Sequence, residues 1–377
     1  MQAVILVGGE GTRLRPLTYG TPKPMVPLFG MPFLEWTLSR LHLAGIDDAI
    51  LAAGYLPRAI TDHLGDGSRL GMKLTYVLED EPLGTAGAIR NVAEHIRGPF
   101  FVLNGDVLTS LDLRAMLEAH RRSGALGSLH LIRVEDPSAF GCVVHDQAGR
   151  VLTFVEKPRA GTAPTDEINA GTYLLEAAVL DAIPSGRSVS IERETFPELL
   201  AAGAHLHAHV TADYWLDLGR PEHYLAAHRD VLDGRLVLWP PADGDALRGR
   251  TYAREATDAP QGVLLPGHVA EGASIASSAS VGPYTVLGRD SRVGERAVVR
   301  GSILWDGVAI DPGAVVEDAI LASNVHVGAG ARIGAGSVIG HDVVVKPNAV
   351  VPQNARLSVR TADDDAGAST QAAGAHN

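Results

Sequence analysis

The chain has 377 residues, a length typical of two or three domains rather than of one small module. Hydrophobic residues make up 46% and charged residues 20%, close to the average of globular proteins, which argues against a chain that is disordered throughout. The formal net charge is −12, and this acidic balance disfavours nucleic acid as a partner, because the phosphate backbone would be repelled.

Cysteine content and the N-terminal residues bear on the compartment. Cys142 is the single cysteine, so nothing in the chain requires an oxidising compartment. The apolar stretch 3–7 has no basic segment before it, and no run of 18 apolar residues follows anywhere. These features predict a cytoplasmic protein that has no membrane partner.

The first half of the chain alternates strand-like apolar runs with segments of helical period, a pattern typical of a mostly parallel sheet covered by helices. The expected strands are residues 3–7, 49–53, 74–78, 100–103 and 128–134. The expected helices are residues 33–43, 85–96 and 113–122. A hairpin over 141–155 and a strand at 171–175 follow. The sequence therefore predicts a Rossmann-like α/β domain over residues 1–238, with an added β region.

The second half of the chain has a different period. Residues 239–261 are polar and rich in proline, and we predict a linker there. Over residues 262–357 an aliphatic residue recurs every six positions, with offsets before Ile310 and Val327. This period fits a parallel β-helix whose hexads, by their residue order, resemble the left-handed type. A Val/Gly-rich sandwich is the alternative, but it has no reason to keep a fixed period. Residues 358–377 lack apolar bulk and are predicted to be disordered.

A glycine-rich loop directly follows the first expected strand. It contains Gly8, Gly9, Gly11 and Thr12. Such loops wrap phosphates with backbone N–H groups, and open α/β sheets bind ligands at that edge. The spacing matches neither the dinucleotide fingerprint nor the Walker motif, and a tight connection alone would explain the glycines. Two cations in the same stretch of an acidic protein, Arg13 and Lys23, favour a bound nucleoside triphosphate.

Residues 8–24 read G-G-E-G-T-R-L-R-P-L-T-Y-G-T-P-K-P, which resembles the signature of the sugar-1-phosphate nucleotidyltransferases. Further stretches are similar to the mannose-1-phosphate guanylyltransferase branch of that family, namely residues 79–88, 104–106, 140–141, 156–158 and 169–173. The similarity covers the chain up to about residue 357. It implies that a nucleoside triphosphate and a sugar 1-phosphate react to give a nucleotide sugar and pyrophosphate with the help of Mg²⁺.

The same resemblance implies roles for individual residues. Arg13 and Lys23 are the expected catalytic cations. Glu79, Gly84 and Thr85 join the glycine-rich loop as expected nucleotide-binding residues. The expected sugar-phosphate ligands are Gly141, Glu156, Lys157, Asn169 and Gly171. Residues 192–194 also fit the family pattern, but no chemistry is assigned to them.

The resemblance also implies that Asp106 and Asp217 are the Mg²⁺ ligands. This fits the general chemistry of Mg²⁺, which is usually held by one or two carboxylates together with substrate phosphates. Each of these motifs has a plainer interpretation from the residues alone. Residues 104–106 would also suit a turn, Asp217 a charge before a helix, and Glu156 with Lys157 a solvated pair. No H-E-x-x-H or C-x-x-C pattern occurs, so a zinc site is disfavoured.

The expected reaction needs no general base, because the phosphate oxygen of the sugar phosphate is already the nucleophile. Positioning and charge neutralisation would then supply the catalysis. GTP is the favoured substrate, because Glu79 can accept two N–H groups of guanine. Thymidylyl or uridylyl transfer is the alternative, with Glu79 in a solvated acidic turn, and the sugar or cyclitol stays open.

Two other classes of function compete with this interpretation. A regulatory paralogue would bind the nucleotide sugar without making it. A hexapeptide acyltransferase would use a histidine base, for which His268, His326 and His341 are available. The flat faces of the β-helix also predict a homo-oligomer, most simply a dimer.

Overall fold

The computed structural model describes residues 1–238, 249–252, 256–257 and 259–359. Residues 239–248, 253–255 and 258 of the expected linker 239–261, and all but two residues of the expected disordered tail 358–377, lie outside the described residues. The chain forms two compact units. The first consists of Met1–Thr12 with Thr21–Leu247, and the second of Arg13–Gly20 with Arg248–Asn377.

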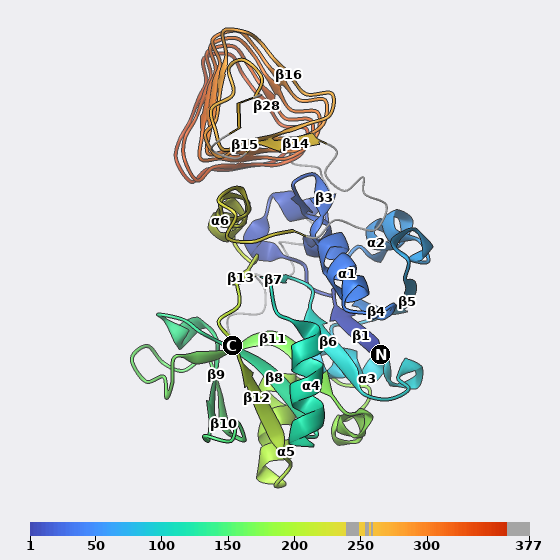
Figure 1. The fold of residues 1–377 in the computed structure, drawn as a ribbon. Coiled ribbons are helices and arrows are strands. Elements are labelled where there is room, and N and C mark those ends of the chain that lie inside the picture. Colours follow the sequence, from blue (N-terminus) through green and yellow to red (C-terminus); the bar gives the residue numbers. More distant parts are fainter. Residues whose placement is uncertain (239–248, 253–255, 258, 360–377) are drawn as a thin grey trace, which may run out of the picture. The chain divides into compact units, whose positions relative to one another are not determined.

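The first unit is built on a nine-stranded sheet (Figure 1). Its parallel part has β1 (Gln2–Leu6) between β4 (Asp48–Ala53) and β6 (Phe100–Asn104), with β5 (Lys73–Leu78) beyond β4. Its other part is joined to β6 by the antiparallel strand β11 (Glu167–Leu175), and contains β8 (Gly127–Arg133), β9 (Gly141–His145), β10 (Val151–Glu156) and β12 (Leu206–Val210). This arrangement confirms the predicted Rossmann-like domain with an added β region.

Five helices cover this sheet, namely α1 (Phe33–Leu43), α2 (Pro57–Leu64), α3 (Gly84–Asn91), α4 (Leu113–Ser123) and α5 (Phe196–Ala201). A sixth helix, α6 (Pro221–Leu232), contacts the short strand β13 (Trp215–Asp217) instead. Local signals explain α4 well, because the Asp112 carboxylate accepts the N–H groups of Arg114 and Ala115 at its start and Gly124 ends it with φ 60°. Among the described residues, no helix is long and apolar enough to cross a membrane.

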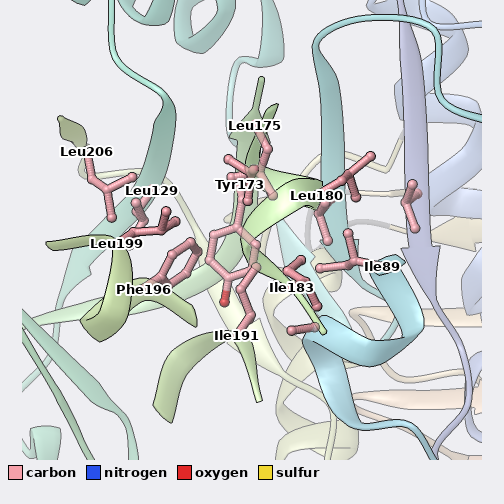
Figure 2. Close-up of a cluster of buried hydrophobic side chains, with 14 of the residues drawn as sticks. Ile89, Leu129, Tyr173, Leu175, Leu180, Ile183, Ile191, Phe196, Leu199 and Leu206 are labelled. Atoms are coloured by element: carbon pink, nitrogen blue, oxygen red, sulfur yellow. The ribbon is translucent and has the colours of Figure 1, made fainter. Parts of the chain in front are cut away.

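The buried side chains lie on both faces of the sheet, because successive residues of a strand point to opposite sides. Val4 belongs to one core cluster, and its neighbour Ile5 to the other. Figure 2 shows the first cluster, in which the Tyr173 ring lies against Phe196 with ring centroids 5.1 Å apart. Burial on both faces explains why the sequence shows apolar runs here rather than alternation.

The second unit contains the predicted parallel β-helix (Figure 1). Its strands are β14 (Gly249–Tyr252), β15 (Gly267–Ala270), β16 (Ser274–Ile275), β17 (Ser280–Val281), β18 (Thr285–Leu287), β19 (Arg292–Val293), β20 (Val298–Arg300), β21 (Ile303–Leu304), β22 (Ala309–Ile310), β23 (Val315–Glu317), β24 (Ile320–Leu321), β25 (His326–Val327), β26 (Arg332–Ile333), β27 (Val338–Ile339), β28 (Val344–Val345), β29 (Val350–Val351) and β30 (Arg356–Leu357). Apart from β14, which lies in the expected linker range and pairs antiparallel with β15, each strand pairs in parallel with strands one coil away.

The register of the β-helix explains the two offsets in its sequence period. Leu287 pairs with Leu304 and Leu304 with Leu321, whereas Leu321 pairs with Ile339. The coils through Leu304 and Leu321 are therefore one residue shorter than the next, so one side of each has five residues instead of six. Both leucines are buried in the coil interior.

Glycine and asparagine stack at the corners of the coils. Gly330 has φ +68°, and a Cβ on it would lie 2.6 Å from Oδ1 of Asn348 one coil above. Gly336 and Asn354 repeat this arrangement at 2.2 Å. A side chain at these corners would therefore be strained by its φ and would also collide with the coil above.

Candidate functional site

A cleft opens at the carboxyl ends of β1 and β6, as expected for ligand sites in open α/β sheets. It has a volume of about 350 Å³ and includes the glycine-rich loop on one side and the start of α3 on the other. Its lining includes Gly8, Gly9, Lys23, Glu79, Gly84, Thr85, Asn104, Gly105 and Asp106. Six of the residues that the sequence predicts as ligands therefore share this cleft with the predicted metal ligand Asp106.

The chain packs closely around Gly8 of the loop and Gly105 of the turn after β6. A Cβ on Gly8 would lie 3.2 Å from Oε1 of Glu79, so the Glu79 carboxylate lies directly against the loop. A Cβ on Gly105 would lie 2.6 Å from the carbonyl oxygen of Leu6, which keeps the turn after β6 close to the end of β1. These contacts bring the ends of neighbouring strands together around the cleft.

Lys23 lies between the two predicted metal ligands. Its ammonium donates to Oδ2 of Asp106 and lies 3.8 Å from Oδ1 of Asp217. The two carboxylates converge because β7 (Val107–Thr109) pairs antiparallel with β13 (Trp215–Asp217). Only 10% of the Lys23 side chain is exposed, so the charges meet in a partly dehydrated environment where electrostatic attraction is stronger than in water.

Asp106 and Asp217 suit a partial coordination shell for Mg²⁺. Two carboxylates already attract one cation here, and Mg²⁺ commonly takes one or two protein carboxylates and completes its shell with phosphates and water. Across the described part of the chain, no group of three or more His, Cys, Asp or Glu side chains is arranged to hold a metal by itself. The donor set is therefore one that would be completed by substrate phosphates.

The predicted sugar-binding residues come from the β9–β10 hairpin and from β11. Gly141 lies opposite Glu156, and a Cβ on it would be 2.6 Å from Oε2 of that carboxylate. Burial, and then the neighbouring Glu192, raise the pKa of the Glu156 carboxyl. Lys157 has φ 49° and its side chain is 58% exposed, with the ammonium 3.8 Å from Oε1 of Glu156. The pair thus offers a half-buried acceptor beside an exposed cation.

Asn169 and Gly171 lie where β11 changes register against β8. Asn169 accepts the N–H of Gly171 at 3.1 Å and donates its amide to the Tyr173 hydroxyl at 2.6 Å. Gly171 has φ +73°, and a Cβ on it would meet the Asn104 amide at 2.6 Å. The change of register therefore brings Gly171 of β11 directly against Asn104, which lines the cleft.

Glu192 is a site residue to which the sequence assigned no chemistry. It contacts Thr85 of the cleft and Tyr173 of β11, at 2.7 and 3.2 Å. Its position depends on a π-helical turn, Ile191–Thr195, which no periodic pattern in the sequence indicates. The signal that could have found it is the fit of residues 192–194 to the family pattern.

Gly11, Thr12 and Arg13 lie outside the lining of the cleft, as do Asp217 and the five predicted sugar-phosphate ligands. Gly11 has φ +63°, and Thr12 and Arg13 begin a 3₁₀ turn, Thr12–Leu14. Arg13 belongs to the second compact unit. Its expected catalytic role therefore stays a prediction.

The histidines of the alternative acyltransferase hypothesis each have a separate environment. His268 bonds to Thr251 at 2.9 Å, and burial lowers its pKa to about 4. His326 contacts Asp311 at 2.9 Å, and the His341 ring lies edge-on to Trp305. His341 also has a pKa lowered by burial.

Comparisons with known proteins agree with this arrangement. Residues 2–234 match a family model described as Nucleotidyl transferase, and residues 265–369 match one described as GMPPB C-terminal domain. Mannose-1-phosphate guanylyltransferase of Mycobacterium tuberculosis is 44% identical over 82% of this chain and 81% of its own. Mannose-1-phosphate guanylyltransferase 1 of Arabidopsis thaliana is 38% identical over 81% of this chain and 86% of its own. The crystal structure of HddC from Yersinia pseudotuberculosis complexed with GMP-PN is 33% identical, with a TM-score of 0.53, over 61% of this chain and 99% of that one.

Proposed function

From the premise that this chain belongs to the nucleotidyl transferase family, as a sugar-1-phosphate nucleotidyltransferase, we propose that it transfers the guanylyl group of GTP to mannose 1-phosphate or a closely related sugar or cyclitol phosphate. The names of its relatives support guanine and mannose. The observation that carries the proposal is that Lys23 and Asp106 line the cleft together with Glu79, and that Asp217 lies beside Lys23.

The proposed reaction is a single in-line displacement. A phosphate oxygen of the sugar phosphate attacks the α-phosphorus of GTP, the bond from that phosphorus to the bridging oxygen breaks, and pyrophosphate leaves with the electron pair. No proton has to be removed from the nucleophile. Lys23 stabilises the negative charge of the phosphates, Lys157 holds the sugar phosphate, and Arg13 is the further cation that the signature motif supplies.

Asp106 and Asp217 are the residues that would hold Mg²⁺. Bound there, the ion supplies charge neutralisation on the phosphates. Lys23 keeps the two carboxylates together, because its ammonium attracts both. Asp106→Asn and Asp217→Asn should each raise the Mg²⁺ concentration needed for half-maximal activity, since an amide oxygen carries no net charge.

Glu79 is the proposed reader of the base. Its Oε2 accepts the N–H of Leu83 at 3.0 Å, which fixes the carboxylate, while Oε1 lies against Gly8 at the cleft. An ionised carboxylate has about four acceptor positions, so Glu79 can also accept the N1–H and N2–H of guanine. Thymine and uracil would turn a carbonyl toward the same oxygen.

A pyrophosphate-release assay with four nucleoside triphosphates and a panel of sugar 1-phosphates tests the proposal. We expect GTP with mannose 1-phosphate to give the highest kcat/KM. Glu79→Gln should narrow the preference for GTP over dTTP by about 1.5–3 kcal/mol, the contribution of a hydrogen bond to a charged group. The exposed Glu81→Gln is the matched control. A preference of the unmodified protein for dTTP would overturn the base assignment, and no turnover with any pair would favour the regulatory paralogue.

We further propose that the protein works in the cytoplasm as a homo-oligomer, a dimer in the simplest case. Stacked parallel strands give the β-helix flat faces, which suit an isologous interface. Light scattering of the full chain and of a chain ending at residue 238 tests this assembly. Equal protomer counts for the two chains would contradict a role of the β-helix in assembly.

A further inference from the structure

The π-helical turn Ile191–Thr195 places Glu192 between two parts of the site. Its Oε2 accepts the hydroxyls of Thr85 at 2.7 Å and of Ser190 at 2.8 Å, and its Oε1 accepts the hydroxyl of Tyr173 at 3.2 Å. Turns of this type are rare and occur frequently at functional sites. One carboxylate therefore receives three hydroxyl groups from three different segments of the chain.

One of these bonds leads to the sugar side. Tyr173 is fully buried, and burial followed by the neighbouring Glu192 raises its pKa well above the ordinary value. Its hydroxyl thus keeps its proton and donates it to Glu192, which leaves the oxygen lone pairs for the amide of Asn169. With its amide nitrogen held there, Asn169 turns its oxygen to the N–H of Gly171.

The second bond leads to the nucleotide side. The Thr85 hydroxyl donates to Glu192 and accepts the N–H of Ile191 at 2.9 Å. The backbone beside it is held as well, because Ala86 donates to the carbonyl of Val189 at 2.9 Å and Val189 donates to that of Leu83 at 2.8 Å. A Cβ on Gly84 would lie 2.6 Å from the Val189 oxygen. The start of α3, which lines the cleft, is therefore held by hydrogen bonds to residues 189–192, the segment that carries Glu192.

We propose that Glu192 is a positioning residue that couples nucleotide binding at the start of α3 to sugar-phosphate binding at Asn169 and Gly171. The inference rests on the proposed function of this site. A carboxylate can accept all three hydroxyls at once, whereas an amide offers a single acceptor oxygen and two donors. In the Glu192→Gln variant, Tyr173 and Thr85 cannot both keep their hydrogen bonds, so movement of one segment no longer orients the other.

Glu194→Gln is a matched control for Glu192→Gln. Glu194 lies in the same turn, accepts the N–H of Ser190 at 3.0 Å and pairs with Arg187 at 3.2 Å. Neither of these contacts involves Thr85 or Tyr173. A loss that depends only on stability of the turn should therefore appear in both variants, and a loss of coupling in Glu192→Gln alone.

Calorimetry tests the coupling with mannose 1-phosphate as the probe, with and without saturating guanosine 5′-(α,β-methylene)triphosphate, whose α–β linkage cannot be broken. We expect the nucleotide to tighten mannose 1-phosphate binding by about tenfold in the unmodified protein and in Glu194→Gln, within the usual range of coupling between sites. In Glu192→Gln the factor should fall to about two or less. Tenfold coupling retained in Glu192→Gln would overturn the inference.

A ligand-free experiment keeps this inference separate from the proposed function. Thr85→Val and Tyr173→Phe each remove one bond to Glu192, so their losses of Tm should be non-additive in the unmodified background and additive in Glu192→Gln. Additive losses in both backgrounds would reject the coupling, whatever the substrate. Absence of pyrophosphate release together with non-additive losses would reject only the proposed substrates.

Discussion

The two units bury different kinds of polar group. In the first unit, among the described residues, buried polar side chains include Glu35, His120 and His130, and Arg40 is enclosed deeply enough that burial lowers its pKa to about 10. The described coils of the β-helix bury His268 and otherwise only hydroxyls, such as Ser291 and Ser337. These two serines each donate to a backbone carbonyl on the adjacent coil, at 3.1 and 2.9 Å.

The contrast follows from how each unit forms its contacts. A coil of the β-helix meets the same kind of neighbour 17 or 18 residues along the chain, so every layer repeats one backbone pattern, and its interior is filled mainly by aliphatic side chains. In the first unit, β1 pairs with residues 98 positions away along the chain. The contacts between the helices and strands of this unit do not repeat from one layer to the next. In the first unit each buried polar or charged group has its own set of neighbours that can pair with it. The repeated coils described for the β-helix do not provide such individual partners. The experiments below test this difference.

The largest effect is expected where the first unit concentrates charge. Lys23→Ala should lower kcat by about 10²- to 10³-fold, roughly 2.7–4 kcal/mol, because it removes a fixed cation from charge that develops on the phosphates. The exposed Lys73→Ala on β5 is the control and should keep full turnover. Steady-state pyrophosphate release measures both variants, and an unchanged kcat in Lys23→Ala would remove this lysine from the mechanism.

The next effect tests the close stacking of the β-helix. Gly288→Ala places a Cβ 2.5 Å from the carbonyl carbon of Trp305 and 2.7 Å from the nitrogen of Asp306. Both are backbone atoms, so relieving the clash requires a shift of the whole neighbouring coil. We expect a loss of about 1–3 kcal/mol, read from the denaturant midpoint. Gly98→Ala in the first unit has no atom within 4 Å and is the matched control. Equal midpoints for the two variants would show that the coils can separate freely.

A third experiment uses acid to probe a buried polar group of the first unit. His130 is buried, and its surroundings lower its pKa to about 3, with burial the main cause. Between about pH 6.5 and 3 the unfolded chain binds a proton there that the folded chain does not, so its contribution to stability is present above pH 6.5 and declines as the pH falls.

The slope of that decline is the measurement. One proton gives about 1.4 kcal/mol per pH unit, so stability between about pH 6 and 5 should fall less steeply in His130→Phe than in the unmodified protein. Replacing the ring also removes the 2.8 Å contact of His130 with Thr211, so the two proteins need not be equally stable at neutral pH. Parallel pH profiles would show that His130 takes up its proton while folded.

The smallest effect concerns a charge pair on the outside of the β-helix. Arg300 and Glu317 lie on adjacent coils, 2.8 Å apart, with side chains 55% and 43% exposed. Solvent screening limits such a pair, so Arg300→Ala should cost about 0.2–1 kcal/mol, and less in about 1 M salt. A salt-independent loss greater than that from Gly288→Ala would mean that charge, rather than stacking, holds the coils together.

Local periodicity in the sequence was enough to predict the main helices and strands and the β-helix. Helix α1 has the predicted limits, Phe33–Leu43, and the main strands of the sheet begin or end within one or two residues of the expected positions, apart from β11, which begins earlier. The predicted helix over 85–96 is shorter in the structure, ending at Asn91 before a separate 3₁₀ turn at Ala93–His95. The six-residue repeat predicted the β-helix because it determines both which residues face the coil interior and which strands pair between coils.

Other features were decided by tertiary structure, because they depend on the register between distant segments. Lys23 meets Asp106 across 83 positions, and Thr85 meets Glu192 across 107, so no local pattern records either contact. The side chains meet only after strands pair, helices pack and the turns close. The sequence alone determined which segments repeat and predicted which residues carry the chemistry. Tertiary packing decided which of those residues share a cleft, because separation along the chain does not set distance in a folded sheet.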